Sequence, residues 1–313
     1  MSAGMLAAFD AELRPPTDYL YLLLDPLAPC ATEHALHIDA LTRQLGEDAL
    51  TRVPRPDLAH QPRALPALMT LARPGVAPDP QLLALIEATA QQDAGYRKRY
   101  VCALLTSAIT PDVVAEQIVD LCRHTAIESA AFVPQFEPLR MELLMAALRQ
   151  QLGGFLWPIN HWLLPTSWGG FATLSARAKD ESTPLPEVAL HAQREAPLVA
   201  DVLAAWRRAT QLRLPYAPRA WQGLTVLPPQ AAATAFRMIR TARTLGLGDR
   251  QNILTLTLHR LLIHPRLHEH ERVRVDIAHA ARGDVPLAEL FATYHDRVWM
   301  NIATYLDAPQ EAL

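Results

Sequence analysis

The chain has 313 residues, of which 50% are hydrophobic and 19% charged, a composition typical of a folded globular protein and not of a disordered one. Its formal net charge is -3, from 29 Lys and Arg against 32 Asp and Glu, which gives no electrostatic support for nucleic-acid binding. Glycine is scarce at 12 residues, which argues against phosphate-cradling loops, whereas the 26 prolines predict frequent element boundaries.

Cysteine usage and the N-terminal sequence both indicate in which cellular compartment the protein is located. The three cysteines, Cys30, Cys102 and Cys122, lie far apart and show no CxxC spacing, which indicates buried thiols in a reducing environment. The first 16 residues have no basic region before their apolar residues, and Asp10 and Glu12 come early, so they do not resemble a signal peptide. We therefore expect a cytoplasmic protein.

Elements of two kinds alternate through the first half of the chain. Short apolar runs predict buried strands at 19–24, 100–106 and 130–136. Apolar residues at helical spacing predict helices at 32–45, 80–91, 111–124 and 137–152. Strands that alternate with helices indicate an α/β N-terminal lobe, which we place at residues 1–175.

The second half of the chain shows helical periodicity only. The helices are expected at 187–212, 229–245, 249–264, 267–282 and 286–306, with Asp249 as a cap and Gly246 and Gly283 as stops. Short loops between them are typical of antiparallel helices. The sequence therefore predicts an all-α C-terminal lobe at residues 176–313, without a sheet, and a chain that is mostly α overall.

The segment from Gln150 to Ala176 contains no charged residue and holds Trp157, Trp162 and Trp168. Its prolines and two Gly-Gly pairs interrupt every apolar stretch long enough to span a membrane, so we expect no membrane span. The segment is either a buried seam between the lobes or a surface where a partner docks. We expect a partner to dock at the junction of the lobes, with at least one of the three tryptophans exposed.

Two carboxylates follow predicted strands, and each precedes a proline. If the strands that end at Asp25 and Glu137 are neighbours, both side chains lie at the same edge of a sheet. Paired carboxylates can perform acid/base catalysis. Asp-Pro and Glu-Pro more often mark a turn in which the acid caps the next element. We therefore interpret Asp25 and Glu137 as structural turn or cap residues, and Arg140, one turn later, as a local partner of Glu137.

A histidine-rich turn raises the possibility of a zinc site. His264 and His268 are four residues apart, and His270 follows. Pro265 breaks the helix that would place the first two on one face, and the HExxH order is missing. We predict no metal site there. Because we recognise no nucleophile, phosphate or metal motif in its required context, we also expect no catalytic residues and no cofactor.

A series of short segments resembles a known protein family. In chain order they are Tyr21-Leu22-Leu23-Leu24-Asp25, Ala64-Leu65-Pro66-Ala67-Leu68, Phe136-Glu137-Pro138-Leu139-Arg140, Phe155-Leu156-Trp157-Pro158-Ile159 and Ala242-Arg243-Thr244-Leu245-Gly246-Leu247. Their order over roughly 19–300 is similar to that of the adaptor-chaperones that serve effectors of the bacterial type VI secretion system. The sequence departs from that family where Pro134 and Gln135 replace an arginine-containing strand.

The resemblance implies a non-enzymatic protein that binds a cognate toxin effector. It would help to load that effector onto the VgrG-type spike without being secreted itself. Two alternatives stay open. One is an enzyme of unrecognised class that uses Asp25 and Glu137 in a cleft between the lobes, and the other is a structural oligomer built through the C-terminal helices.

Overall fold

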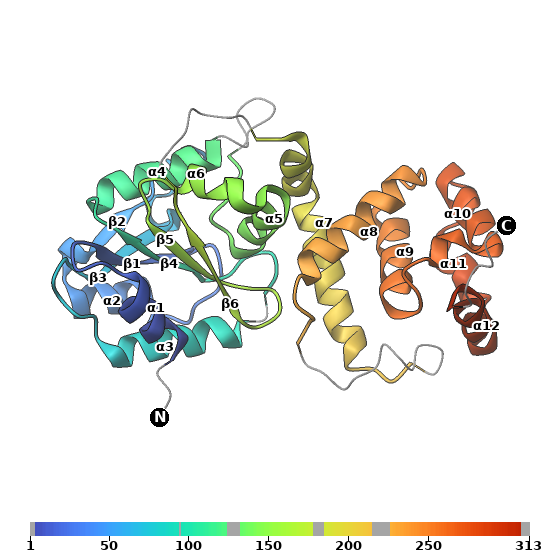
Figure 1. The fold of residues 1–313 in the computed structure, drawn as a ribbon, viewed down its shortest axis with the longest axis horizontal. Helices are drawn as coiled ribbons and strands as arrows, with labels where there is room; N and C mark the ends of the chain where they lie inside the picture. The colour runs from blue at the N-terminus through green and yellow to red at the C-terminus, as the bar shows by residue number, and fades with distance from the viewer. Residues whose placement is uncertain (1–3, 94, 124–131, 178–184, 215–225, 308–313) are drawn as a thin grey trace. The chain divides into compact units, whose positions relative to one another are not determined.

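The computed structural model describes residues 4–93, 95–123, 132–177, 185–214 and 226–307. The chain divides into two compact units, Met1–Arg194 and Glu195–Leu313 (Figure 1). The boundary at 175 that the sequence suggests therefore precedes the division between the units, which falls inside a helix.

A six-stranded sheet forms the centre of the first unit, and its strand order is β2-β3-β1-β4-β5-β6. The strands are β1 (Tyr19–Leu24), β2 (Leu50–Arg52), β3 (Ala67–Ala72), β4 (Val101–Ser107), β5 (His161–Pro165) and β6 (Phe171–Ser175). All neighbours pair antiparallel, and at the centre Leu22 lies opposite Met69 on one side and Leu104 on the other. The uncharged segment of the sequence supplies the last hairpin of this sheet, β5 and β6.

Helices cover both faces of the sheet. One face packs against α1 (Met5–Leu13), α2 (Ile38–Leu45) and α3 (Pro80–Gln92), and the other against α4 (Pro111–Arg123), α5 (Pro138–Leu148) and α6 (Gly153–Leu156). Alternate residues of β1 enter the two cores: Leu20, Leu22 and Leu24 face α1–α3, whereas Tyr21 and Leu23 face α4–α6. Burial on both faces explains why β1 is apolar at every position and shows no polar alternation.

The second unit is helical. After α7 (Glu187–Thr210), which begins in the first unit, come α8 (Ala231–Thr244), α9 (Arg250–Leu262), α10 (Glu271–Arg282), α11 (Leu287–Ala292) and α12 (Asp296–Asp307). The side chain of Asp249 accepts a hydrogen bond from the Asn252 amide at 2.9 Å and caps α9. Gly283 ends α10 with a φ of 80°, a backbone conformation that favours glycine. No strand occurs in this unit within the described ranges.

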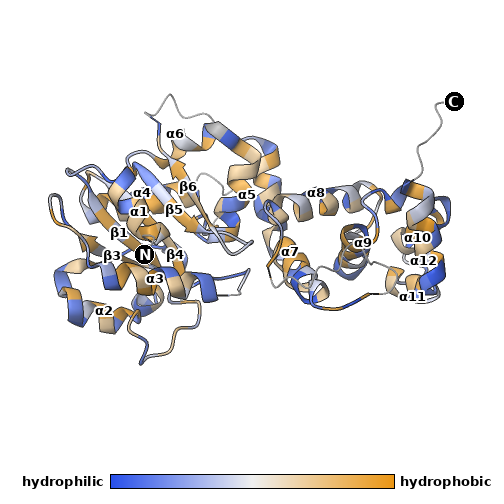
Figure 2. Ribbon diagram, turned by 60° about the horizontal axis from the view of Figure 1, so that its bottom comes forward, coloured by the Kyte–Doolittle hydropathy of each residue, from blue (hydrophilic) through white to orange (hydrophobic). Residues whose placement is uncertain are grey.

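Short 3-10 helices occur at Glu47–Ala49, Pro56–Leu58, Pro62–Ala64, Arg149–Leu152 and Leu267–Glu269. Figure 2 shows hydrophobic and hydrophilic residues on the same helices, which is the pattern expected where one side of a helix is buried and the other is solvated. None of the helices in the described part of the chain has the length and apolar character that a membrane span needs.

The predicted fold class is confirmed: the protein is mostly helical, with an α/β unit followed by a helical one. One predicted strand is wrong. Of the stretch 130–136, residues 130 and 131 lie outside the described residues, and 132–136 form no strand. Pro134 has no amide hydrogen to donate to a neighbouring strand, and its carbonyl instead accepts from the Glu137 amide in a turn that leads into α5.

Candidate functional site

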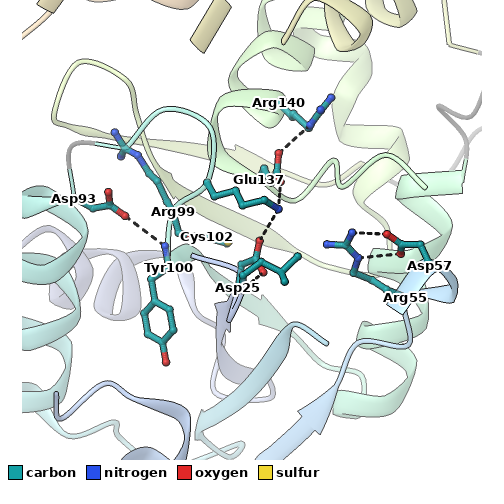
Figure 3. A network of polar contacts seen from close by, with 11 residues as sticks. Asp25, Arg55, Asp57, Asp93, Arg99, Tyr100, Cys102, Glu137 and Arg140 are labelled. Carbon is teal, nitrogen blue, oxygen red and sulfur yellow. Dashed lines mark hydrogen bonds and ion pairs between the residues drawn. The ribbon is translucent and has the colours of Figure 1, made fainter. Parts of the chain in front are cut away.

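The two carboxylates singled out in the sequence lie together in the first unit and share a cation. Asp25 is fully buried and Glu137 is 6% exposed. The Lys98 ammonium nitrogen lies 3.3 Å from Glu137 Oε1 and 3.9 Å from Asp25 Oδ2. Figure 3 shows Asp25 and Glu137 on neighbouring segments; a dashed line runs from each carboxylate to the same nitrogen, which lies between them. We call Asp25, Lys98, Glu137 and Arg140 the buried charge cluster.

Backbone hydrogen bonds fix both carboxylates at the ends of their elements. Asp25 directly follows β1; its amide donates to the carbonyl of Tyr100 at 2.9 Å, and its Oδ1 accepts from the Leu27 amide at 3.0 Å. Glu137 precedes α5, and its side chain makes no cap hydrogen bond to that helix. Asp25 therefore accepts a turn hydrogen bond, as its interpretation as a turn residue requires, whereas Glu137 stands at the N-cap position of α5 without a side-chain cap bond. The two residues lie together at a strand end and a helix start, and not at the ends of two neighbouring strands.

Arg140 extends the cluster to α7. Its Nε donates to Glu137 Oε2 at 2.9 Å, the local pairing that the sequence suggests, and its Nη1 donates to the Gln193 carbonyl at 3.0 Å. That carbonyl is the one that the amide of residue 197 would reach in a regular helix, but Pro197 has no amide hydrogen. Arg140 thus satisfies a backbone acceptor that the proline leaves open, and it ties α5 to α7.

A second ion pair lies beside the cluster. Arg55 is 5% exposed and forms a two-pronged contact with Asp57, at 2.7 Å and 3.2 Å. Its guanidinium lies 4.8 Å from the ring centre of Phe132 and 5.8 Å from that of Phe136. Sequence reasoning missed both Arg55 and Lys98, because neither has a motif and each comes from a loop far from Asp25 or Glu137 along the chain.

Burial dominates the electrostatics of the two carboxylates. Burial raises the pKa of the Asp25 carboxyl above its ordinary value, against the Leu27 hydrogen bond and the charge of Lys98. Burial also raises the pKa of Glu137, against the charges of Arg140 and Lys98. Two carboxylates and two cations balance one another, and a fully buried Asp25 offers no surface to a substrate.

Replacement of Asp25 by asparagine should make stability less dependent on pH. Because the folded-state pKa of Asp25 is raised, the unfolded chain loses that proton first, and the contribution of Asp25 to the free energy of unfolding falls as pH rises above about 4. Asparagine keeps an acceptor for the Leu27 amide but carries no charge. We expect the stability of the variant relative to wild type to increase from pH 4 upwards in urea titrations. An unchanged or opposite trend would contradict the raised pKa.

The histidine-rich turn does not form a metal site in the described residues, where no three His, Cys, Asp or Glu side chains are placed to hold an ion. The ring of His264 accepts from the Arg266 amide at 3.1 Å through Nδ1, and its Nε2 lies 3.5 Å from Asp307. The ring of His270 packs edge-on against Tyr305. Burial lowers the pKa of His268 and of His270.

The three tryptophans of the uncharged segment lie in three different environments. Trp162 is on β5, opposite Leu105 and Leu174, and is fully buried in the core between the sheet and α4–α6. Trp168 is half-buried in the turn between β5 and β6. Trp157 follows α6 and is 47% exposed. Of the three, Trp157 is the most exposed, and docking of a partner against it stays a prediction.

Hydrogen bonds hold the backbone of the turn that carries Trp157 both before and after this residue. Before it, Gln117 Nε2 of α4 donates to the carbonyl of Phe155 at 3.1 Å. After it, the hydroxyl of Ser107, the last residue of β4, donates to the carbonyl of Pro158 at 2.7 Å. Two elements that are separate in sequence therefore hold the backbone around an exposed indole, and little order need be lost when a partner covers it.

Two further exposed aliphatic side chains belong to the same region. Ile109 is 37% exposed, and its amide donates to the Ser107 hydroxyl that also holds Pro158. Val113 is 44% exposed on α4, which packs beside α6 (Figure 1). We call Ile109, Val113 and Trp157 the Trp157 surface. The exposed side of the predicted helix at 111–124 is the signal that could have indicated Val113.

Comparison with models of known protein families, with characterised proteins and with solved structures finds no match for this chain.

Proposed function

We propose that this protein is a non-enzymatic adaptor and chaperone of type VI secretion. It binds a cognate toxin effector in the cytoplasm and helps to load it onto a VgrG-type spike. The resemblance of the segments around Asp25, Glu137 and Trp157 motivates the secretion system. The observation that carries the binding role is the Trp157 surface, since an exposed tryptophan on a braced turn is the kind of anchor that dominates protein interfaces.

The enzyme alternative has weaker support. A catalytic pair must reach a substrate, whereas Asp25 has no exposed surface and Glu137 is held by Lys98 and Arg140. Buried carboxylates balanced by two cations at the ends of β1 and α5 suit the positioning of helices better than proton transfer.

Purification of the tagged chain from its native bacterium, followed by mass spectrometry, tests the proposal. We expect enrichment of one toxin effector and of a spike protein over a tag-only control. Recovery of neither, from cells that produce a working secretion system, would contradict the adaptor role.

Replacement of Trp157 by alanine should weaken binding of the captured effector and leave the chain folded. Loss of a large aromatic anchor typically costs about 2 kcal/mol or more, which is roughly a thirtyfold increase in Kd. Isothermal titration with the purified effector measures this change, and the melting temperature serves as the check on folding. Tyr305→Ala is the matched control, because Tyr305 is an aromatic residue 67% exposed in the second unit. Equal affinity for wild type and Trp157→Ala would place the interface elsewhere.

A further inference from the structure

We infer that the effector segment received at the Trp157 surface is an apolar anchor flanked by lysine or arginine. The inference rests on the proposed function and adds the chemistry of the partner. Its basis is the set of charged side chains beside the exposed apolar residues. These charged side chains lie on α4 or close to it.

The position of Val113 on α4 sets the geometry. Val114, Ile118 and Leu121 belong to the buried side of this helix. Val113 and Gln117 are four residues apart and thus follow one stripe along the helix. Gln117 donates to the carbonyl of Phe155 in α6, two residues before Trp157, so the stripe that holds Val113 borders the turn of Trp157.

An acidic stripe runs beside Val113 on the solvent side. Asp112, Glu116 and Asp120 recur every four residues, and all three are exposed. Asp120 pairs with Arg123 at 3.0 Å, whereas Asp112 and Glu116 form no ion pair with another described residue. Asp112 is in the first turn of α4, where the helix dipole favours a negative charge, and Glu116 lies one turn further on.

Negative charge therefore lies on one side of the Trp157 surface. On the α4 side, the carboxylates of Asp112 and Glu116 border the surface and have no ion-pair partner among the described residues. Arg177 lies at the opposite end of α6, where its amide donates to the Gly153 carbonyl. A chain of net charge -3 gives little long-range field, so the acidic border acts locally. It favours a partner with cations beside its apolar anchor and repels one with anions there.

Two labelled synthetic peptides provide the probe. One has a Leu-Trp-Leu core with three lysines on each side, and the other has the same core with three glutamates on each side. We expect the lysine peptide to bind the wild-type chain at least about tenfold more tightly in 50 mM salt, with most of the difference lost near 500 mM, because salt screens exposed charges. Fluorescence anisotropy measures both affinities.

Charge-reversal variants test whether Asp112 and Glu116 cause the preference for the lysine peptide. Asp112→Lys with Glu116→Lys should abolish or invert the preference for the lysine peptide, and Trp157→Ala should weaken both peptides. The matched control is Glu12→Lys with Glu47→Lys, which changes the net charge equally at exposed positions in α1 and just after α2, the helices on the other face of the sheet. Melting temperatures verify that each variant is folded.

Equal binding of the two peptides, or an equal effect of the control pair, would overturn the inference. A fall in the mass of the free chain in sedimentation, caused by the Trp157 or Asp112 and Glu116 variants, would show that a second copy occupies the surface and would overturn it as well. If the captured effector is lost on Trp157→Ala but kept by the charge-reversed pair, the adaptor function stands and the basic partner does not.

Discussion

Replacement of Trp162 by alanine should lower the free energy of unfolding by about 3–5 kcal/mol, the usual cost of removing a large aromatic side chain from a packed core. Trp162 is fully buried on β5 and contacts residues of the sheet and of the helices that cover it. Chemical denaturation of the two proteins measures the difference.

Trp162→Phe is the matched variant for this experiment. Phenylalanine keeps an aromatic ring in the core and removes an indole N–H that is buried without a hydrogen-bond partner in the described residues. We expect it to cost much less than alanine. A Trp162→Ala protein as stable as wild type would mean that the side chain is not part of the core.

Replacement of Lys98 by alanine should destabilise the protein by an amount that grows with pH. The change leaves Asp25 buried without its cation and leaves Glu137 with Arg140 alone. Removal of one partner from a buried ion pair costs about 3–5 kcal/mol. Because the Lys98 side chain is 39% exposed and screened by solvent, we expect about 2 kcal/mol near pH 8.

The pH dependence follows from the carboxylates. Without Lys98, their folded-state pKa values rise further, so protonation relieves the repulsion at low pH and the loss of stability shrinks towards pH 4. Lys98→Arg keeps the charge and should retain most of the stability at every pH. A loss of stability that is the same at pH 5 and pH 8 would show that Lys98 acts through packing and not through charge.

Helices and strands could be predicted from the sequence where their own residues follow a clear apolar pattern. The apolar runs of β1 and β4 and the helical spacing of α4 and α9 identify those elements directly. The strand expected at 130–136 is not formed over 132–136, because its apolar residues resemble a strand in sequence, whereas Pro134 and the turn into α5 decide the structure. The hairpin of β5 and β6 was hidden among prolines and glycines that also fit irregular backbone.

The candidate site was predicted in part. Asp25 and Glu137 could be paired from the ends of their elements, but the cation between them could not, because Lys98 comes from the loop before β4 and only tertiary packing places it there. The sequence marks the three tryptophans but does not show which of them is exposed. Trp157 and Trp162 are only five residues apart. Trp157 is exposed because it lies on a turn, whereas Trp162 is buried because it lies on a strand covered on both faces.

The helix α7 has a consequence for cooperativity. The division between the two units, at 194 and 195, falls within its 24 residues, so the units share a helix and are not joined there by a linker. Helical hydrogen bonds form cooperatively, but Pro197 removes the bond to the Gln193 carbonyl that would cross this division. Arg140 donates to that carbonyl instead, so a side chain of α5 replaces a missing bond of the shared helix. A truncation at that boundary would cut a helix whose Gln193 carbonyl is held by Arg140, whereas one that precedes Glu187 would leave the helix whole.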